Sequence, residues 1–193
     1  RGLQRQRAKG KVSDLEALLE EHPLEGNCGI AHTRWATHGV PSTENAHPHL
    51  SGDTLALVHN GIIENHEALR AELSDAGYVF DSETDSEVVA HLVHRLMKGG
   101  LDLFAAVREA VKRLRGAYAI AVISEREPGV VVGAREGSPL VLGLGDGENF
   151  LASDVYPLLN ETDRFVFLSE GDVVRLDADT VQVVDGDDQP VER

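Results

Sequence analysis

Apolar residues recur at helical spacing in four stretches of the chain, which predicts four helices. Two of them open with the spacing of a capping box, Ser13-Asp14-Leu15-Glu16 and Thr84-Asp85-Ser86-Glu87, and Asn65 can cap another. The last two are separated only by a short stretch containing Gly99-Gly100, so we expect them to form an antiparallel pair. The predicted helices cover residues 13–22, 66–76, 85–98 and 102–114.

Short β-rich runs bounded by turn residues predict strands, which dominate the second half of the chain. An early strand is expected at 27–33, then a long loop over 34–50, then a strand over 54–59 that ends at Asn60-Gly61. The run 119–123 is apolar on both faces, which is typical of a sheet covered on each side. The economical arrangement is an α+β domain with two sheets between layers of helices. Further strands are predicted at 117–124, 130–134, 140–144, 150–153, 165–168, 172–176 and 181–184.

Composition narrows the class of protein. The 193 residues are enough for one globular domain, and no interior boundary is visible. The formal net charge of −15 opposes binding to nucleic acid and to anionic membrane surfaces. No apolar run approaches the roughly 18 residues that span a bilayer, and the basic first residues lack the apolar stretch of a secretory signal. The single cysteine, Cys28, excludes an internal disulfide framework and favours a cytoplasmic location.

Three polar positions are candidates for chemistry. Arg34 offers a planar fork of donors that matches a carboxylate, although a purely structural arginine is an alternative. Asn60 and the Gly61 N–H could together hold an oxyanion, but Asn-Gly is also the commonest hairpin turn. Asp85 could bind a ligand ammonium group or simply favour the start of a helix.

Histidines are concentrated in the first third of the chain and invite a metal-site hypothesis. The spacing does not support it, because there is no H-E-x-x-H motif, no cysteine pair and no acidic residue at a helical offset. We therefore expect no metal and interpret the histidines as hydrogen-bonded structural groups. The residues concerned are His32, His38, His47, His49 and His59.

Several motifs, in a fixed order and spacing, carry a family resemblance. The first four are Gly29-Ile30-Ala31-His32-Thr33-Arg34-Trp35-Ala36-Thr37-His38-Gly39, Asn45-Ala46-His47-Pro48-His49, His59-Asn60-Gly61-Ile62-Ile63-Glu64-Asn65 and Ser82-Glu83-Thr84-Asp85. The likeness continues through Gly116-Ala117-Tyr118, Gly137-Ser138-Pro139-Leu140, Gly147-Glu148-Asn149-Phe150 and Ala152-Ser153-Asp154, so it covers nearly the whole chain. On these motifs, the chain resembles the glutaminase domain of the glutamine–fructose-6-phosphate aminotransferases, also called glucosamine-6-phosphate synthases, which are class II glutamine amidotransferases. The wording Thr33-Arg34-Trp35-Ala36-Thr37-His38-Gly39 is the specific part.

The resemblance implies a fold and a set of site residues. The fold is the four-layer αββα fold of N-terminal-nucleophile hydrolases, with two facing antiparallel sheets. Asn60 and Gly61 would form the oxyanion hole, Arg34 would bind the glutamine α-carboxylate, and Asp85 would hold its α-ammonium. Thr37 and His38 would line the pocket, and Trp35 would lie where released ammonia leaves. No cofactor is implied.

The resemblance also implies a mechanism whose nucleophile this sequence lacks. In the family, an N-terminal cysteine attacks the glutamine amide, and its own α-amine serves as base. Arg1 matches family sequence downstream of that cysteine, so the first strand and helix are expected to be missing, and Cys28 is interior and no substitute. We therefore interpret residues 1–193 as an N-terminally truncated amidotransferase domain, inactive by itself.

The implied partners are L-glutamine, fructose-6-phosphate and the sugar isomerase domains of the same polypeptide, in an enzyme that forms a homo-oligomer. Ammonia released from glutamine would then be used to make glucosamine-6-phosphate. Two other hypotheses remain open at this point. One is a degenerate glutamine-binding or interaction domain that has lost its nucleophile, and the other is a metal hydrolase that uses the histidines.

Overall fold

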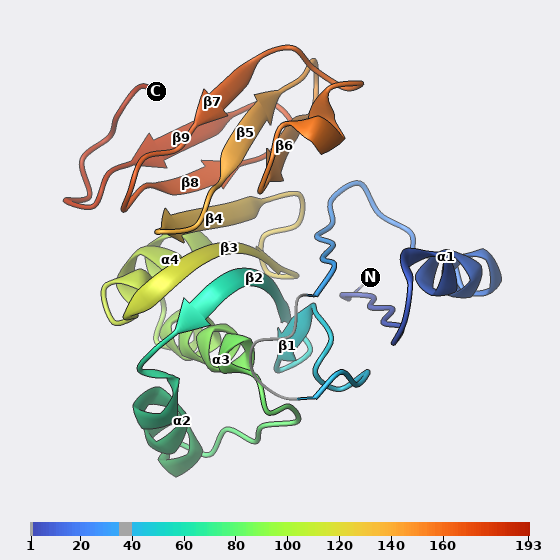
Figure 1. Cartoon of the computed structure of the whole chain (residues 1–193). Helices are drawn as coiled ribbons and strands as arrows, with labels where there is room; N and C mark the ends of the chain where they lie inside the picture. Colours follow the sequence, from blue (N-terminus) through green and yellow to red (C-terminus); the bar gives the residue numbers. More distant parts are fainter. Residues whose placement is uncertain (1, 35–39) are drawn as a thin grey trace.

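The computed structural model describes residues 2–34 and 40–193 as an α+β domain with two antiparallel sheets (Figure 1). The helices are α1 (Val12–Glu21), α2 (His66–Asp75), α3 (Asp85–Lys98), α4 (Leu103–Val111) and the 3₁₀ turn η1 (Tyr156–Leu158). The strands are β1 (His49–Ser51), β2 (Leu55–Ile63), β3 (Gly116–Ser124), β4 (Val131–Glu136), β5 (Val141–Leu144), β6 (Asn149–Ala152), β7 (Phe165–Phe167), β8 (Val173–Leu176) and β9 (Val181–Val184). The prediction of an α+β fold with two antiparallel sheets is confirmed.

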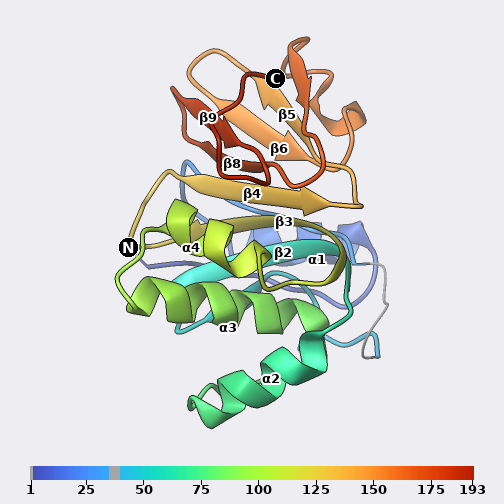
Figure 2. The same cartoon turned by 90° about the vertical axis from the view of Figure 1, so that its left-hand side faces the viewer.

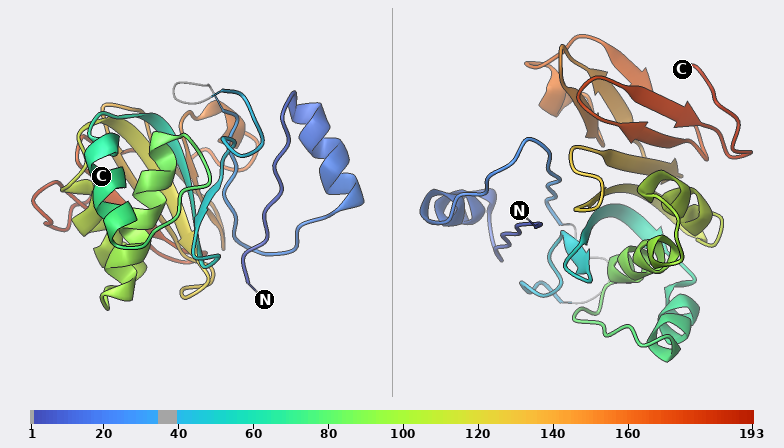
Figure 3. Two further views of the ribbon diagram at one scale, coloured as in Figure 1. Left: turned by 90° about the horizontal axis from the view of Figure 1, so that it is seen from below. Right: turned by 180° about the vertical axis from the view of Figure 1, so that it is seen from behind.

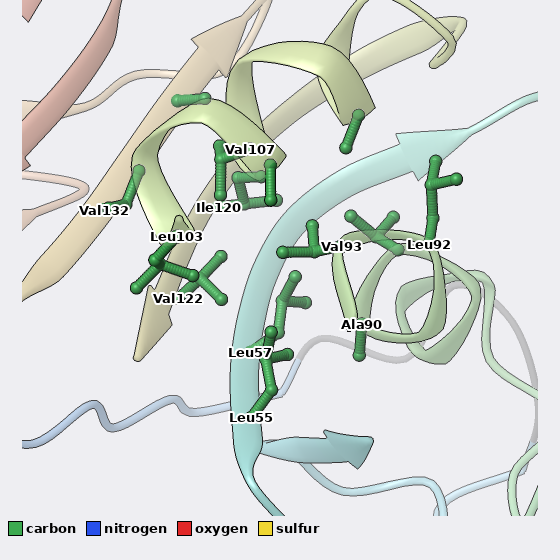
Figure 4. Packing of buried hydrophobic residues seen from close by; sticks show 14 of the residues in the cluster. Leu55, Leu57, Ala90, Leu92, Val93, Leu103, Val107, Ile120, Val122 and Val132 are labelled. Carbon is green, nitrogen blue, oxygen red and sulfur yellow. The ribbon is translucent and has the colours of Figure 1, made fainter. Parts of the chain in front are cut away.

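The larger sheet has six strands in the order β1-β2-β3-β4-β8-β9, and all neighbours are antiparallel. Helices α3 and α4 lie side by side on one of its faces (Figure 2). Val93 of α3 and Val107 of α4 lie in one core with Leu57 and Ile120 of the sheet (Figure 4). This cluster is the main core, and it holds the start of α3 against the end of β2.

The smaller sheet, in the order β6-β5-β7, covers the other face of the larger sheet at β4, β8 and β9. Val174 and Leu176 of β8 and Val183 of β9 pack there with Leu142 of β5. Strands β3, β4 and β8 therefore contribute side chains to an apolar cluster on each face. The continuous apolar runs that predicted a sheet covered on both sides are explained by this arrangement.

Helix starts follow the sequence signals only in part. Thr84 caps α3 as predicted, because its hydroxyl accepts from the Glu87 amide. In α1 the predicted cap at Ser13 is wrong: the N-cap is Lys11, whose amide donates to the Asp14 carboxylate at 2.7 Å. Asn65 does occupy the N-cap of α2, but its side chain does not cap the helix and instead donates to the Arg113 carbonyl.

Strand β2 runs through Asn60-Gly61 instead of ending there, so the predicted boundary at His59 and the hairpin-turn interpretation are both wrong. Asn60 pairs with Ala119 and Gly61 with Tyr118 of β3. Gly61 has φ of 125°, and a Cβ at this position would collide with the Ala117 carbonyl. The glycine therefore permits an irregular, closely packed strand rather than a turn.

The predicted strand over 27–33 is also wrong, because these residues belong to no sheet. Their side chains do alternate, with Cys28, Ile30 and His32 partly buried and the residues between them exposed. Alternation shows which side chains point inward, but a strand also needs a neighbouring backbone to pair with. The segment that leads into 27–33 runs apart from the main sheet together with α1 (Figure 3).

The predicted loop over 34–50 is interrupted near its end by β1, whose three residues are too few to show a period in the sequence. Within the part of the chain that the structure describes, no helix is long and apolar enough to cross a membrane.

Candidate active site

A cavity of about 280 Å³ lies at the end of β2 and the start of α3. It gathers four of the residues predicted for the site, and these come from three separate segments of the chain: Arg34, Asn60, Gly61 and Asp85. The other lining residues are His32, His47, His59, Ile62, Thr84 and Ser86. The fold therefore brings together a guanidinium group, a carboxylate and a side-chain amide beside a glycine.

Asn60 is positioned by both its backbone and its side chain. The strand pairing with Ala119 fixes its backbone, and its Oδ1 accepts a hydrogen bond from His32 Nε2 at 2.8 Å. An amide oxygen only accepts, so His32 Nε2 carries the proton in this contact. With Oδ1 engaged, the Nδ2 group is the part of the Asn60 side chain that can donate to a ligand.

Asp85 is 2% exposed and is the first residue of α3, where the helix dipole favours a negative charge. Its Oδ2 accepts from the Ile63 amide at 2.8 Å, which joins the end of β2 to the start of α3. The turn before α3 is held by Glu87, whose carboxylate accepts from the Asp81 and Ser82 amides at 2.9 and 2.8 Å. The carboxylate of Asp85 is thus placed at the cavity by a rigid local network.

Arg34 reaches the cavity from the segment that carries the specific motif. One of its guanidinium nitrogens donates to the Val40 carbonyl at 3.3 Å, so the arginine is tied to the chain on the far side of residues 35–39. The predictions made for Trp35, Thr37 and His38 fall outside the described residues.

The histidines around the cavity contact one another and their polar neighbours. His47 stacks on His32 with ring centroids 4.1 Å apart, and its Nδ1 accepts from the His59 amide at 3.3 Å. His59 Nδ1 lies 2.8 Å from the Ser86 hydroxyl. Burial holds the pKa of His47 far below its ordinary value and lowers that of His49 to about 4, so both rings are neutral at pH 7. The described residues contain no group of three or more His, Cys, Asp or Glu that could hold a metal ion.

Several lining residues were not predicted. His32 lies directly before the specific motif, two residues before Arg34, and the extended alternation predicted for 27–33 could have placed the two side chains on the same face. His47 and His59 belong to the quoted motifs, where the sequence favours structural groups over a metal site, and Ser86 belongs to a predicted capping box. Their positions depend on how β2 and α3 pack, which periodicity does not reveal.

Comparison with known proteins shows the family to which the chain belongs. Residues 32–160 match the family described as glutamine amidotransferase domain. This chain belongs to that family. This match confirms the resemblance seen in the sequence motifs. The residues that line the cavity lie within the matched range.

The chain is also similar over almost its whole length to curated enzymes named glutamine–fructose-6-phosphate aminotransferase (isomerizing). It is 56% identical over 191 residues to the enzyme of Pseudomonas putida and 57% identical over 196 residues to that of Bordetella pertussis. In each case the match covers 99% of this chain, but only 31% and 32% of the relative. The chain therefore spans about a third of the length of these relatives.

Solved structures support the fold of the amidotransferase domain. The glutamine phosphoribosylpyrophosphate amidotransferase of B. subtilis, complexed with ADP and GMP, has a TM-score of 0.66 at 26% identity over 80% of this chain and 34% of that one. A glutamine aminotransferase class-II domain protein from Silicibacter pomeroyi has a TM-score of 0.54 at 21% identity, over 72% and 70% of the two chains, and is similar in fold.

The chain has a second, larger cavity of about 740 Å³ between residues 2–5, residues 24–30, the start of β2 and the end of β3. Cys28 lines this cavity and not the smaller one, and burial raises the pKa of its thiol. A raised pKa leaves less thiolate for attack, so neither its place nor its ionisation suits Cys28 to act as a nucleophile.

Proposed function

We propose that this chain is the glutaminase part of a glutamine–fructose-6-phosphate aminotransferase, which hydrolyses glutamine to glutamate and ammonia. The observation that carries the proposal is the composition of the 280 Å³ cavity, where Arg34, Asp85 and the Asn60-Gly61 pair meet. An arginine fork complements the α-carboxylate of an amino acid, a carboxylate complements its α-ammonium, and amide donors complement the oxygen of a side-chain amide. Glutamine carries all three groups.

In this proposal, Arg34 and Asp85 orient the substrate, and Asn60 Nδ2 with the Gly61 N–H stabilises charge on the amide oxygen. Attack on the amide carbon converts that oxygen into an oxyanion, so these donors act most strongly in the transition state. His32, through its bond to Asn60 Oδ1, leaves Nδ2 available for this purpose. Trp35, Thr37 and His38 keep their predicted roles in the glutamine pocket and at the ammonia exit.

The nucleophile in this proposal is the N-terminal cysteine of the family, so the 193 residues alone bind glutamine without hydrolysing it. The position of Cys28 in the other cavity supports this assignment. The alternative is a glutamine-binding domain that has lost its nucleophile. Such a domain shares the cavity but shows no turnover in the intact polypeptide, by which we mean the 193 residues together with the N-terminal segment and the isomerase domains proposed for the whole protein.

Further parts of the proposal concern the whole protein. Because the relatives are about three times as long as their matched part, we propose that sugar isomerase domains of the same polypeptide receive the ammonia and transfer it to fructose-6-phosphate. The assignment of residues 1–193 to a single glutamine amidotransferase domain belongs to the same proposal. A cytoplasmic location and a homo-oligomeric state stay predictions.

Glutamine analogues that each lack one group test the proposed site. Calorimetric titration of the intact polypeptide with its nucleophilic cysteine replaced by alanine, so that no ligand is hydrolysed, should show binding of L-glutamine and weaker binding of glutaramic acid, which lacks the α-amine, and of 4-aminobutanamide, which lacks the α-carboxylate. Each missing charged contact should cost on the order of 1.5 to 3 kcal/mol. Equal affinity for all three compounds would contradict the roles of Arg34 and Asp85.

Arg34→Lys is expected to raise KM for glutamine about tenfold, with a smaller change in kcat. Lysine keeps the charge but loses the planar fork that can bind a carboxylate through two hydrogen bonds. Steady-state glutaminase kinetics of the intact polypeptide measure this. A matched control is Arg175→Lys, since Arg175 forms its ion pair with Asp177 in the distant β8 region. Unchanged glutamine saturation in Arg34→Lys would remove Arg34 from the site.

Cys28→Ser is expected to leave glutaminase kcat and KM of the intact polypeptide unchanged, because Cys28 lines only the larger cavity. The same assay on the 193-residue chain should detect no hydrolysis. Turnover by the 193-residue chain that disappears in Cys28→Ser would show that the nucleophile had been assigned wrongly.

A further inference from the structure

Asn45 lies beside the cavity without lining it, and it is 2% exposed. Its Nδ2 donates to the Val40 carbonyl at 3.0 Å and lies 3.2 Å from Glu83 Oε2, while its Oδ1 accepts from the Glu83 amide at 2.9 Å. A backbone carbonyl only accepts and a backbone amide only donates, so these contacts fix which way the Asn45 amide points.

The two segments that Asn45 joins each carry one of the residues proposed to bind the substrate head group. On one side, the Val40 carbonyl that accepts from Asn45 also accepts from the Arg34 guanidinium. On the other side, Glu83 stands two residues before Asp85 at the start of α3. Asn45 therefore connects the anchor of Arg34 to the segment that sets the position of Asp85.

A buried amide in this position is costly to lose. Removing it takes one hydrogen bond from the Glu83 amide and one from the Val40 carbonyl, which keeps its bond to Arg34, and it leaves a void where a side chain that is 2% exposed had packed. Both effects destabilise the present arrangement of the two segments. Relief of that cost requires a shift of one segment relative to the other. Such a shift changes the spacing between Arg34 and Asp85, which must match the fixed distance between the two charged groups of an amino acid.

We propose that Asn45 is a positioning residue that sets the separation of Arg34 and Asp85 and thereby the affinity for the α-amino acid head group. The proposal rests on the proposed function of the cavity. Asn45 does not contact Asn60 or Gly61 in the described hydrogen-bond network, so it acts on substrate binding rather than on the stabilisation of the oxyanion.

The test compares Asn45→Ala with Asn65→Ala in the intact polypeptide. Asn65 joins two segments through a similar pair of side-chain hydrogen bonds but does not line the cavity. Its Nδ2 donates to the Arg113 carbonyl at 2.9 Å, and its Oδ1 accepts from the Arg115 amide at 3.0 Å. Both substitutions should lower the melting temperature. Only Asn45→Ala should raise KM for glutamine, by about tenfold, with kcat changed less than about twofold.

An unchanged KM in Asn45→Ala, together with a lowered melting temperature, would overturn the proposal and leave Asn45 a structural residue. If Asn45→Ala does not fold, the pair Asn45→Asp and Asn45→Asp/Glu83→Gln replaces it. The carboxylate of Asn45→Asp repels that of Glu83 and should raise KM, whereas the added Glu83→Gln supplies a donor and should recover part of the loss. Equal KM in these two variants would also overturn the proposal. Failure of the proposed function gives a different result, which is no glutamine hydrolysis by the unmodified polypeptide.

Discussion

Asn60→Ala is expected to lower kcat for glutamine hydrolysis by about 10² to 10³, which corresponds to roughly 3 to 4 kcal/mol of transition-state stabilisation. The effect on KM should be small, because the substrate amide oxygen acquires negative charge only as the tetrahedral intermediate forms. Steady-state kinetics of the intact polypeptide measure both constants. The size of the effect follows from the site, where Asn60 Nδ2 is left to donate after Oδ1 has bonded to His32.

A structural role for Asn60 would give a different pattern. Loss of the bond to His32 would lower the melting temperature while turnover stayed near that of the unmodified protein. Asn149→Ala serves as the matched control. Asn149 lies in strand β6 of the smaller sheet, and its Nδ2 donates to the Asp177 carbonyl at 2.8 Å. Near-normal kcat in Asn60→Ala, with a melting temperature lowered as in Asn149→Ala, would mean that the oxyanion-hole assignment is wrong.

The domain is expected to lose stability as the pH falls from 7 to 5. Burial lowers the pKa of His49 from 6.5 to about 4, so the folded protein keeps this ring neutral while the unfolded chain takes up a proton below about pH 6.5. The free energy of unfolding should therefore fall by on the order of 2 kcal/mol between pH 6.5 and 5 from His49 alone. His47, whose pKa burial also lowers, acts in the same direction.

The pH range from 7 to 5 separates the effect of the histidines on stability from the effect of Glu87. Burial raises the pKa of Glu87, but the hydrogen bonds it accepts outweigh burial and bring it to about 2. Stability from Glu87 is therefore lost only as the pH falls below about 4.5. Urea unfolding at several pH values between 7 and 5 measures the effect of the histidines.

His49→Gln should flatten the pH dependence of stability, because glutamine can still bond to the Thr84 hydroxyl that lies 3.1 Å from His49 Nε2 but does not titrate. His22→Gln, at an exposed position, should leave it unchanged. A free energy of unfolding that stays constant from pH 7 to 5 would contradict the buried, neutral state of these rings.

The site residues were predictable from the sequence to the extent that motifs specify them. Arg34, Asn60, Gly61 and Asp85 were named from the resemblance, and the structure brings all four to one cavity. Residue preferences alone favoured a hairpin turn at Asn60-Gly61. The turn is absent because Gly61 packs directly against the backbone of β3, a tertiary contact that no local pattern encodes.

The strands after residue 116 were predicted nearly to their ends because apolar runs alternate there with clear turn residues. The segment 27–33 shows the limit of that approach, since the alternation of its side chains is present but the pairing is not. The cap of α1 failed for a similar reason. At Lys11 the N-cap contact is made by the backbone amide, which donates to the Asp14 carboxylate, whereas the sequence signature used for the prediction requires a capping side chain, as at Ser13.

The most direct test of the central claim is a crystal structure of the intact polypeptide, with its nucleophilic cysteine replaced by alanine to prevent hydrolysis, and L-glutamine bound. Glutamine should occupy the 280 Å³ cavity, with its α-carboxylate on the Arg34 guanidinium, its α-ammonium on Asp85, and its side-chain oxygen within hydrogen-bond distance of Asn60 Nδ2 and the Gly61 N–H. Glutamine bound instead in the larger cavity beside Cys28, or in the smaller cavity with its amide turned toward Arg34, would contradict the account.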